Sequence, residues 1–283
     1  MSDSGSSIRV WVDGERVDDK PSLSALDHGV TVGDGAFETC KVVDGEVIAR
    51  SMHLARFDRT LSGLGLPAVD RDRIEEGIAA VLAEPMALGR TRYMVTGGAG
   101  PLGSGRLDSP MTYIVTAGSS QPQAPSCSLV TLPWVRNERG ALVGLKTTSY
   151  AENVVALAYA KKHDAEEGIF ANTKGELCEG TATNIFVVID GEILTPPVES
   201  GLLGGIGRAL TLRWCAEAGM SIREETMPLD VLESADEIFV TSSLRDVQPV
   251  HSMDGRELTP GPITAQAARV FADAIAIDID PIP

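Results

Sequence analysis

The chain has 283 residues, of which 43% are hydrophobic and 23% charged, close to ordinary globular usage. Acidic residues outnumber basic residues by 40 to 24, so the formal net charge is −16. This charge repels phosphate backbones and argues against general nucleic-acid binding. No apolar run approaches the ~20 residues of a membrane span, so a membrane protein is not expected.

Residues 1–7 are polar and acidic, and we expect them to form a disordered tail. The four cysteines lie far apart and form no CxxC pair, so no metal site is predicted. Free thiols of this kind are typical of a reducing cytoplasm, where we expect the protein to reside. The cysteines are Cys40, Cys127, Cys178 and Cys215.

The first half of the chain predicts strands joined by tight turns, followed by two helices. Asp44-Gly45 separates two apolar runs and predicts a hairpin. Ser51 is a candidate cap for a helix whose buried face would carry Leu54, Phe57 and Leu61. The expected strands cover 8–13, 36–43, 47–49, 91–95 and 111–117, and the expected helices cover 52–64 and 73–88.

A Gly/Pro-rich loop separates the last two of these strands. Its segment Gly98-Ala99-Gly100-Pro101-Leu102-Gly103 fits the GxGxxG pattern of dinucleotide-binding proteins. That fingerprint requires a helix directly afterwards, and the sequence here predicts none. We therefore interpret the segment as a flexible loop facing the substrate.

The second half mixes strands and helices without a regular βαβ rhythm, which favours an α+β fold with two domains. We expect a small N-terminal domain over 8–117, an uncharged linker over 118–126 and a larger C-terminal domain over 127–283. Hairpins are predicted at Lys174-Gly175 and Asp190-Gly191. The expected strands cover 127–132, 237–241 and 247–251, and the expected helices cover 150–163, 206–218 and 263–274.

Lys146 is the lysine with the most suggestive surroundings among the six in the chain. It follows Leu142-Val143-Gly144-Leu145, which we interpret as an apolar strand, and precedes small hydroxyl residues. A desolvated lysine has a lowered pKa and a nucleophilic amine, as Schiff-base chemistry requires. Taken alone, the pattern also fits an ordinary lysine at the end of a strand.

Two further segments have both a chemical and a structural interpretation. Gly201 to Arg208 is glycine-rich and opens a helix, so its bare N–H groups suit a phosphate, or it is simply a tight connector. Glu179 stands before small polar residues and an apolar strand, and it could face a cavity or merely mark a strand edge. Arg56 and the cluster Thr241-Ser242-Ser243 are equally ambiguous by themselves.

In chain order, Lys146, the Glu179 segment, Gly201 to Arg208 and Thr241-Ser242-Ser243 together resemble the fold-type IV pyridoxal-phosphate enzymes. These enzymes include branched-chain and D-amino-acid aminotransferases and aminodeoxychorismate lyases. The resemblance also includes Gly33-Asp34-Gly35-Ala36-Phe37-Glu38-Thr39 and His53-Leu54-Ala55-Arg56-Phe57, and it covers about residues 8–275. It implies the two-domain α+β fold of these enzymes, with pyridoxal 5'-phosphate between the domains, and a homodimer.

The resemblance also implies roles for individual residues. Lys146 would bind the cofactor as a Schiff base and move protons, while Glu179 would pair with the pyridine nitrogen. The phosphate would rest on Arg56, on the N–H groups of Ile206 and Gly207, and on Ser242 and Ser243. Gly207 departs from the family pattern, where threonine is common, so only its backbone remains for this contact.

Substrate-side positions favour 4-amino-4-deoxychorismate lyase, which would release pyruvate and 4-aminobenzoate for folate synthesis. Ala151 stands where branched-chain aminotransferases usually have tyrosine, and the loop lacks the Arg-x-His pair of the D-amino-acid enzymes. Glu152-Asn153 and the Gly-Asp-Gly motif look lyase-like. A class IV aminotransferase acting on branched-chain or D-amino acids remains the alternative.

The small-molecule substrate carries carboxylates, which need cationic or N–H partners. Arg92 and Arg106, near the Gly/Pro-rich loop, are the candidates for this role. A regulator that binds the cofactor without catalysis would need neither Lys146 nor Glu179, and their presence therefore argues against that alternative.

Overall fold

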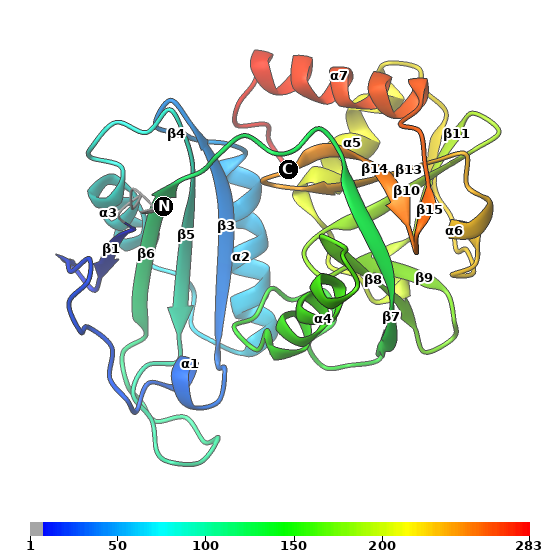
Figure 1. The fold of residues 1–283 in the computed structure, drawn as a ribbon. Helices are drawn as coiled ribbons and strands as arrows, with labels where there is room; N and C mark the ends of the chain where they lie inside the picture. Colours follow the sequence, from blue (N-terminus) through cyan, green and yellow to red (C-terminus); the bar gives the residue numbers. More distant parts are fainter. Residues whose placement is uncertain (1–7) are drawn as a thin grey trace. The chain divides into compact units, whose positions relative to one another are not determined.

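The computed structural model describes residues 8–283, which divide into two compact units (Figure 1). Unit 1 contains residues up to 122 together with 145–150 and 279–283, and unit 2 contains 123–144 and 151–278. The predicted α+β class is confirmed, since both units combine helices with a mainly antiparallel sheet.

Unit 1 is built on a six-stranded antiparallel sheet in the order β2-β1-β6-β5-β3-β4. Its strands are β1 (Arg9–Val12), β2 (Glu15–Arg16), β3 (Gly35–Val43), β4 (Glu46–Val47), β5 (Leu88–Thr96) and β6 (Thr112–Ser119). Its helices are α1 (His28–Thr31), α2 (Arg50–Leu64) and α3 (Arg71–Val81). Figure 1 shows α2 running along β3, with which it is in contact.

The core of unit 1 forms where α2 and α3 cover one face of this sheet. Leu54, Phe57 and Leu61 of α2 are all buried, as their spacing predicts. They pack with β3 residues such as Ala36 and Cys40. The hairpin at Asp44-Gly45 is confirmed: φ is 50° at Asp44 and 84° at Gly45, the two positive values of a type I′ turn.

Unit 2 is built on a nine-stranded sheet in the order β12-β11-β10-β13-β14-β7-β8-β9, with β15 paired to β14. The first strands are β7 (Cys127–Arg136), β8 (Glu167–Asn172), β9 (Leu177–Gly180), β10 (Asn184–Ile189) and β11 (Glu192–Thr195). The others are β12 (Ile222–Glu224), β13 (Glu237–Ser242), β14 (Asp246–Met253) and β15 (Arg256–Glu257). The hairpins at Lys174-Gly175 and Asp190-Gly191 join β8 to β9 and β10 to β11, as predicted.

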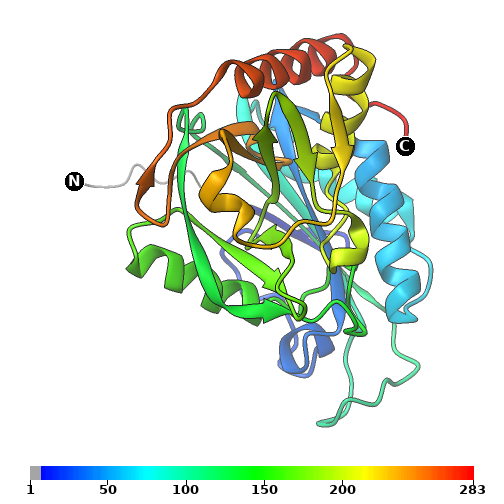
Figure 2. The same cartoon turned by 90° about the vertical axis from the view of Figure 1, so that its right-hand side faces the viewer.

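The helices of unit 2 are α4 (Ala151–Lys162), α5 (Ile206–Glu217), α6 (Val231–Ser234) and α7 (Pro262–Ile277), with a 3-10 turn at Val198–Ser200. Figure 2 shows the red α7 beside the yellow α5, and these two helices contact each other and strands β13 and β14. The hydrophobic core of this sheet contains Leu129, Ile185 and Val240. Among residues 8–283, no helix is long and apolar enough to cross a membrane.

The boundaries of the two units agree only in part with the predicted linker over 118–126. The first boundary, after residue 122, falls inside the predicted linker, but residues 145–150 and 279–283 belong to unit 1 and not to the C-terminal domain. Backbone hydrogen bonds explain both exceptions: Phe37 N donates to Lys146 O at 3.0 Å, and Ala49 N donates to Ile279 O at 2.7 Å. The tail predicted over 1–7 lies outside the described residues.

Three local predictions are wrong. Ser51 does not cap α2, because the cap residue is Ala49 and the Ser51 hydroxyl bonds Asp280 at 2.8 Å. The helix expected over 73–88 begins earlier, behind the capping carboxylate of Asp70, and ends at Val81. The residues before Lys146 form turns and not an apolar strand.

Candidate active site

The segment that carries Lys146 lies along the edge of β3 in unit 1. Thr147 pairs with Ala36, and Thr148 N donates to Gly35 O at 2.8 Å. The backbone N–H of Lys146 donates to the Thr60 hydroxyl of α2 at 3.3 Å. A strand edge and a helix therefore fix the backbone of this lysine, although it lies outside regular secondary structure.

Two aromatic rings of unit 1 surround the Lys146 amine. Its Nζ lies 4.6 Å from the ring centroid of Phe37 and 5.6 Å from that of Tyr150. The two rings meet edge to face, with centroids 5.3 Å apart. Aromatic faces attract a cation and restrict its side chain, so the amine is held close to one position.

Arg56 is buried in unit 1, which excludes the interpretation as a solvated helix arginine. Its Nε donates to Glu38 Oε1 at 2.8 Å, and its Nη2 donates to Glu38 Oε2 at 2.6 Å. His53 Nδ1 lies 2.7 Å from the same Oε2. Two parallel bonds of this kind fix the plane of the guanidinium as well as its position.

The electrostatics of this cluster are those of a stable ion pair. Burial alone would raise the pKa of Glu38, but Arg56 and then His53 outweigh it and lower the pKa from 4.5 to about 2. Burial lowers the pKa of His53, although Glu38 opposes that effect. Glu38 is thus a carboxylate at neutral pH, and we assign the Nδ1 proton to a neutral His53.

The two candidate arginines of unit 1 have different surroundings. Arg92 is exposed, and its Nε donates to the Thr39 hydroxyl at 3.0 Å while its guanidinium lies 4.8 Å from the Phe37 ring centroid. Within residues 8–283 it has no ion-pair partner. Arg106 instead donates two hydrogen bonds to the Asp34 carboxylate, from Nε at 2.7 Å and from Nη2 at 2.6 Å. It also donates to the carbonyls of Leu64 and Gly65.

In unit 2, Glu179 is held at the end of the sheet by two donors. Arg136 Nε donates to its Oε1 at 3.2 Å, and the N–H of Leu203 donates to its Oε2 at 2.9 Å. Arg136 also bonds Glu152 and lies 4.2 Å from the Phe170 ring centroid. The carboxylate is therefore nearly buried, oriented and next to a cation, and the interpretation as a plain strand-edge charge does not hold.

The first turn of α5 lies against the Ser242 backbone. The cap residue, Gly205, supplies no side chain, so no side-chain bond covers the first N–H groups of the helix. A Cβ on Gly207 would lie 3.4 Å from the backbone of Ser242. The first turn of α5, with Ile206 and Gly207, therefore adjoins the turn that contains Ser242 and Ser243, and these two turns are together called the cradle.

The predicted site residues fall into two sets. Arg56, Arg92, Arg106 and Lys146 lie in unit 1, and Glu179, Ile206, Gly207, Ser242 and Ser243 lie in unit 2. In unit 1, the cationic groups of Lys146 and Arg92 both lie near the Phe37 ring. In unit 2, the first turn of α5 lies next to the Ser242 backbone. Arg106 is bound to the Gly-Asp-Gly motif.

No role was predicted for Glu38, His53 or Arg136, which hold the predicted residues in place. Strand alternation contained a signal for Glu38, because it shares a face with Ala36 and Cys40 and a charge there requires a buried partner. Nothing local pointed to Arg136, whose partner is 43 residues away in the sequence.

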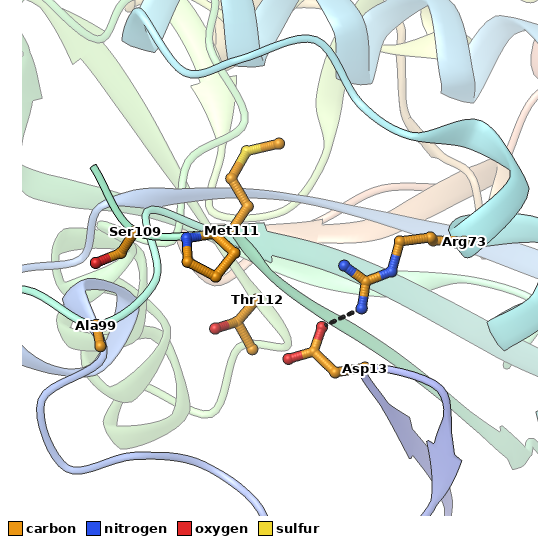
Figure 3. Close-up of a pocket in the computed structure, with 7 residues that line it drawn as sticks. Asp13, Arg73, Ala99, Ser109, Met111 and Thr112 are labelled. Carbon is orange, nitrogen blue, oxygen red and sulfur yellow. Dashed lines mark hydrogen bonds and ion pairs between the residues drawn. The ribbon is translucent and has the colours of Figure 1, made fainter. Parts of the chain in front are cut away.

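A pocket of ≈ 290 Å³ in unit 1 contains none of these residues (Figure 3). It lies between Asp13, Arg73 and the end of the Gly/Pro-rich loop. Arg73 Nη2 donates to Asp13 at 2.7 Å, so the cation of this pocket already has a carboxylate partner. This pocket therefore does not coincide with the predicted cofactor-binding or substrate-binding residues.

The α+β fold of this chain matches that of the fold-type IV aminotransferases. Residues 35–253 match the family described as "Amino-transferase class IV", and the chain therefore belongs to that family. The predicted fold class and the predicted cofactor are confirmed, since the family depends on pyridoxal phosphate.

Relatives with different names cover nearly the whole chain. A protein of Methanocaldococcus jannaschii, named "Putative branched-chain-amino-acid aminotransferase", is 29% identical over 94% of this chain and 96% of its own length. A "D-alanine aminotransferase" of Staphylococcus haemolyticus is 28% identical over 93% and 96%. A solved structure from Legionella pneumophila, named "Putative 4-amino-4-deoxychorismate lyase", has a TM-score of 0.84 and is 26% identical over 90% and 96%.

Each unit, taken by itself, contains groups whose chemistry fits the cofactor. Lys146 supplies an amine, Glu179 an oriented carboxylate for a ring nitrogen, and the α5 turn a cluster of donors for a phosphate. An anion at the start of α5 would accept hydrogen bonds from the first N–H groups, which the cap residue Gly205 leaves without a side-chain partner.

Proposed function

We propose that this chain is a 4-amino-4-deoxychorismate lyase that releases pyruvate and 4-aminobenzoate. The observation that carries the proposal is the ion pair between Arg106 and Asp34. The ion pair holds the loop arginine against the Gly-Asp-Gly motif, and Asp108 stands where the Arg-x-His pair of D-amino-acid aminotransferases has its histidine. The tyrosine usual in branched-chain enzymes is also missing, because Ala151 stands there.

Lys146 and Glu179 would perform the proton chemistry. When bound, pyridoxal phosphate would supply an electron-withdrawing ring. Lys146 would remove the proton from the substrate's ring carbon that bears the amine, and Glu179 would keep a proton on the cofactor's ring nitrogen. Arg56, the α5 turn at Ile206 and Gly207, and Ser242 with Ser243 hold the phosphate.

The lyase reaction needs no second substrate. The C–H bond at the amine-bearing carbon and the C–O bond to the enolpyruvyl group break, the ring becomes aromatic and the departing group takes a proton to become pyruvate. All atoms of the substrate are recovered in the two products. We assign Arg92 to one substrate carboxylate, since it lies near Lys146 and lacks an ion-pair partner in residues 8–283.

A class IV aminotransferase is the second candidate, and the names of the two relatives found by sequence favour it. The lyase-like pair Glu152-Asn153 does not decide between the two. Glu152 bonds Arg136, and the Asn153 amide donates to Thr181 O at 2.5 Å, so both side chains support other parts of unit 2.

Pyruvate release decides between the two activities. Cofactor-loaded protein is incubated with 4-amino-4-deoxychorismate without any 2-oxoacid, and pyruvate and 4-aminobenzoate are measured. Equal amounts of both products are expected, and Lys146→Ala abolishes them while Lys162→Ala, on the exposed side of α4, does not. Failure to form pyruvate, together with amino transfer from D-alanine or a branched-chain amino acid to a 2-oxoacid, would refute the lyase and establish the aminotransferase.

We also propose a cytoplasmic homodimer that acts on small molecules and binds neither nucleic acid nor membranes. The four cysteines are free and buried, as suits a reducing compartment. Helix α4 exposes Val154 and Val155, which suit a surface covered by a second copy. Sedimentation should give a dimer that is weakened by Val154→Lys, and a wild-type monomer would contradict the proposal.

A further inference from the structure

Glu167 is a buried carboxylate of unit 2 that the chemistry above does not use. It is 1% exposed and stands at the start of β8. Burial raises its pKa, which Thr181 and Arg245 oppose. A carboxylate this deep is costly unless it is hydrogen-bonded and paired, so its partners are the reason it can be accommodated.

One oxygen of Glu167 holds the turn that follows Glu179. Its Oε1 accepts hydrogen bonds from the Thr181 hydroxyl and, at 2.7 Å, from the N–H of Ala182. Thr181 is two residues beyond Glu179, at the end of β9. The position of the strand end that carries the ring-nitrogen partner therefore depends on this oxygen.

The other oxygen of Glu167 reaches the turn that carries the phosphate-binding serines. Its Oε2 lies 3.4 Å from Nη2 of Arg245. The backbone N–H of Arg245 in turn donates to the Ser242 hydroxyl at 3.1 Å, and its Nη1 donates to Gln248 at 2.5 Å. Arg245 is thus part of the three-residue connection between β13 and β14.

The geometry points to Glu167 as a positioning residue that joins the two halves of the cofactor cradle in unit 2. Its contact with Arg245 fixes the position of the Ser242 turn beside the first turn of α5. Its contact with Thr181 fixes the position of the end of β9. It touches neither substrate nor cofactor. The inference rests on the proposed roles of Glu179 and Ser242.

The contacts of the two Glu167 oxygens can be tested separately by substitution. Glu167→Gln keeps an acceptor for Thr181 and Ala182 but loses the ion pair with Arg245. We therefore expect this variant to disturb the Ser242 turn and to weaken phosphate binding. Thr181→Val removes the hydroxyl that donates to Glu167 Oε1 and leaves the contact between Glu167 and Arg245 unchanged. Glu237→Gln is the matched control, because Glu237 is also buried in unit 2 but accepts N–H bonds from Ile263 and Thr264 of α7.

The test compares the affinities of the apoprotein for pyridoxal phosphate and for pyridoxal, which lacks the phosphate, by titration of the visible absorbance. Glu167→Gln should weaken binding of the phosphorylated form about tenfold, as for loss of one charged hydrogen bond, and that of pyridoxal by less than about twofold. Thr181→Val should weaken both forms alike. Glu237→Gln should leave the ratio of the two affinities unchanged.

Each outcome has a definite meaning. If folded Glu167→Gln protein keeps the wild-type ratio, or if Glu237→Gln lowers it equally, Glu167 is not a positioning residue. If Glu167→Gln does not fold, Arg245→Met replaces it in the same titration, and an unchanged ratio overturns the inference. A wild-type protein that binds both forms equally would instead refute the proposed phosphate cradle.

Discussion

The most quantitative prediction concerns Glu38, the buried carboxylate that fixes Arg56. Its pKa falls from 4.5 to about 2 in the folded protein, which corresponds to ~3 kcal/mol at about 1.4 kcal/mol for each tenfold change in acidity. Glu38→Gln removes this contribution and leaves the Arg56 charge buried without its carboxylate. We therefore expect the variant to lose about 3–5 kcal/mol of unfolding free energy at pH 7.

The pH dependence follows from the direction of the shift. A lowered pKa stabilises the folded protein fully above pH 4.5, and this stabilisation disappears as the pH falls towards 2. Wild type should accordingly lose its advantage over Glu38→Gln by about 1.4 kcal/mol per pH unit below 4.5. Between pH 7 and 5 the difference between the two proteins should stay constant.

Urea unfolding of the apoprotein at pH 7, 5 and 3.5, followed by circular dichroism, measures these differences. Glu84→Gln is the control, because Glu84 pairs with Arg9 at 2.8 Å but is half exposed. The control should change little at any pH, since exposed ion pairs contribute little. A Glu38→Gln variant as stable as wild type at pH 7, or a difference that does not shrink at pH 3.5, would refute the reasoning.

Three further variants test the site. Lys146→Ala should lower turnover by at least ~10²-fold and abolish the visible absorbance change on cofactor binding, and normal turnover would rule out the assigned role. Arg92→Met should raise KM about tenfold with a smaller change in kcat, and an unchanged KM would remove Arg92 from the substrate site. Gly205→Ala places a Cβ 1.9 Å from Asn184 Oδ1 and displaces the Asn184 bond to Leu203 O, which should cost about 1–3 kcal/mol of unfolding free energy. Gly204→Ala is its control, since a Cβ there meets only Val198 at 4.0 Å, and equal losses would contradict this account.

The features that the sequence predicted well are those encoded by neighbouring residues. Asp44-Gly45 and Asp190-Gly191 specify tight turns by themselves, and the spacing of Leu54, Phe57 and Leu61 specifies a buried helix face. The ordered motifs then led to the family. Each of these signals fits within one turn or one helix.

The features that escaped prediction depend on residues far apart in the chain. Ser51 looks like a cap, but its side chain is engaged by Asp280, 229 residues later. The ion pair between Arg106 and Asp34 joins residues 72 positions apart, and no local pattern indicated it. The positioning of Lys146 depends on a strand edge that no local pattern reveals, since the residues before it are turns.

The division of the chain has a consequence for biosynthesis. Residues 145–150 and 279–283 complete unit 1, although almost all of unit 2 is translated between them. Asp280 holds the first turn of α2 through the N–H and the hydroxyl of Ser51, at 2.7 and 2.8 Å. During synthesis on the ribosome, these two hydrogen bonds of unit 1 therefore form only after residues 151–278 of unit 2 have been translated.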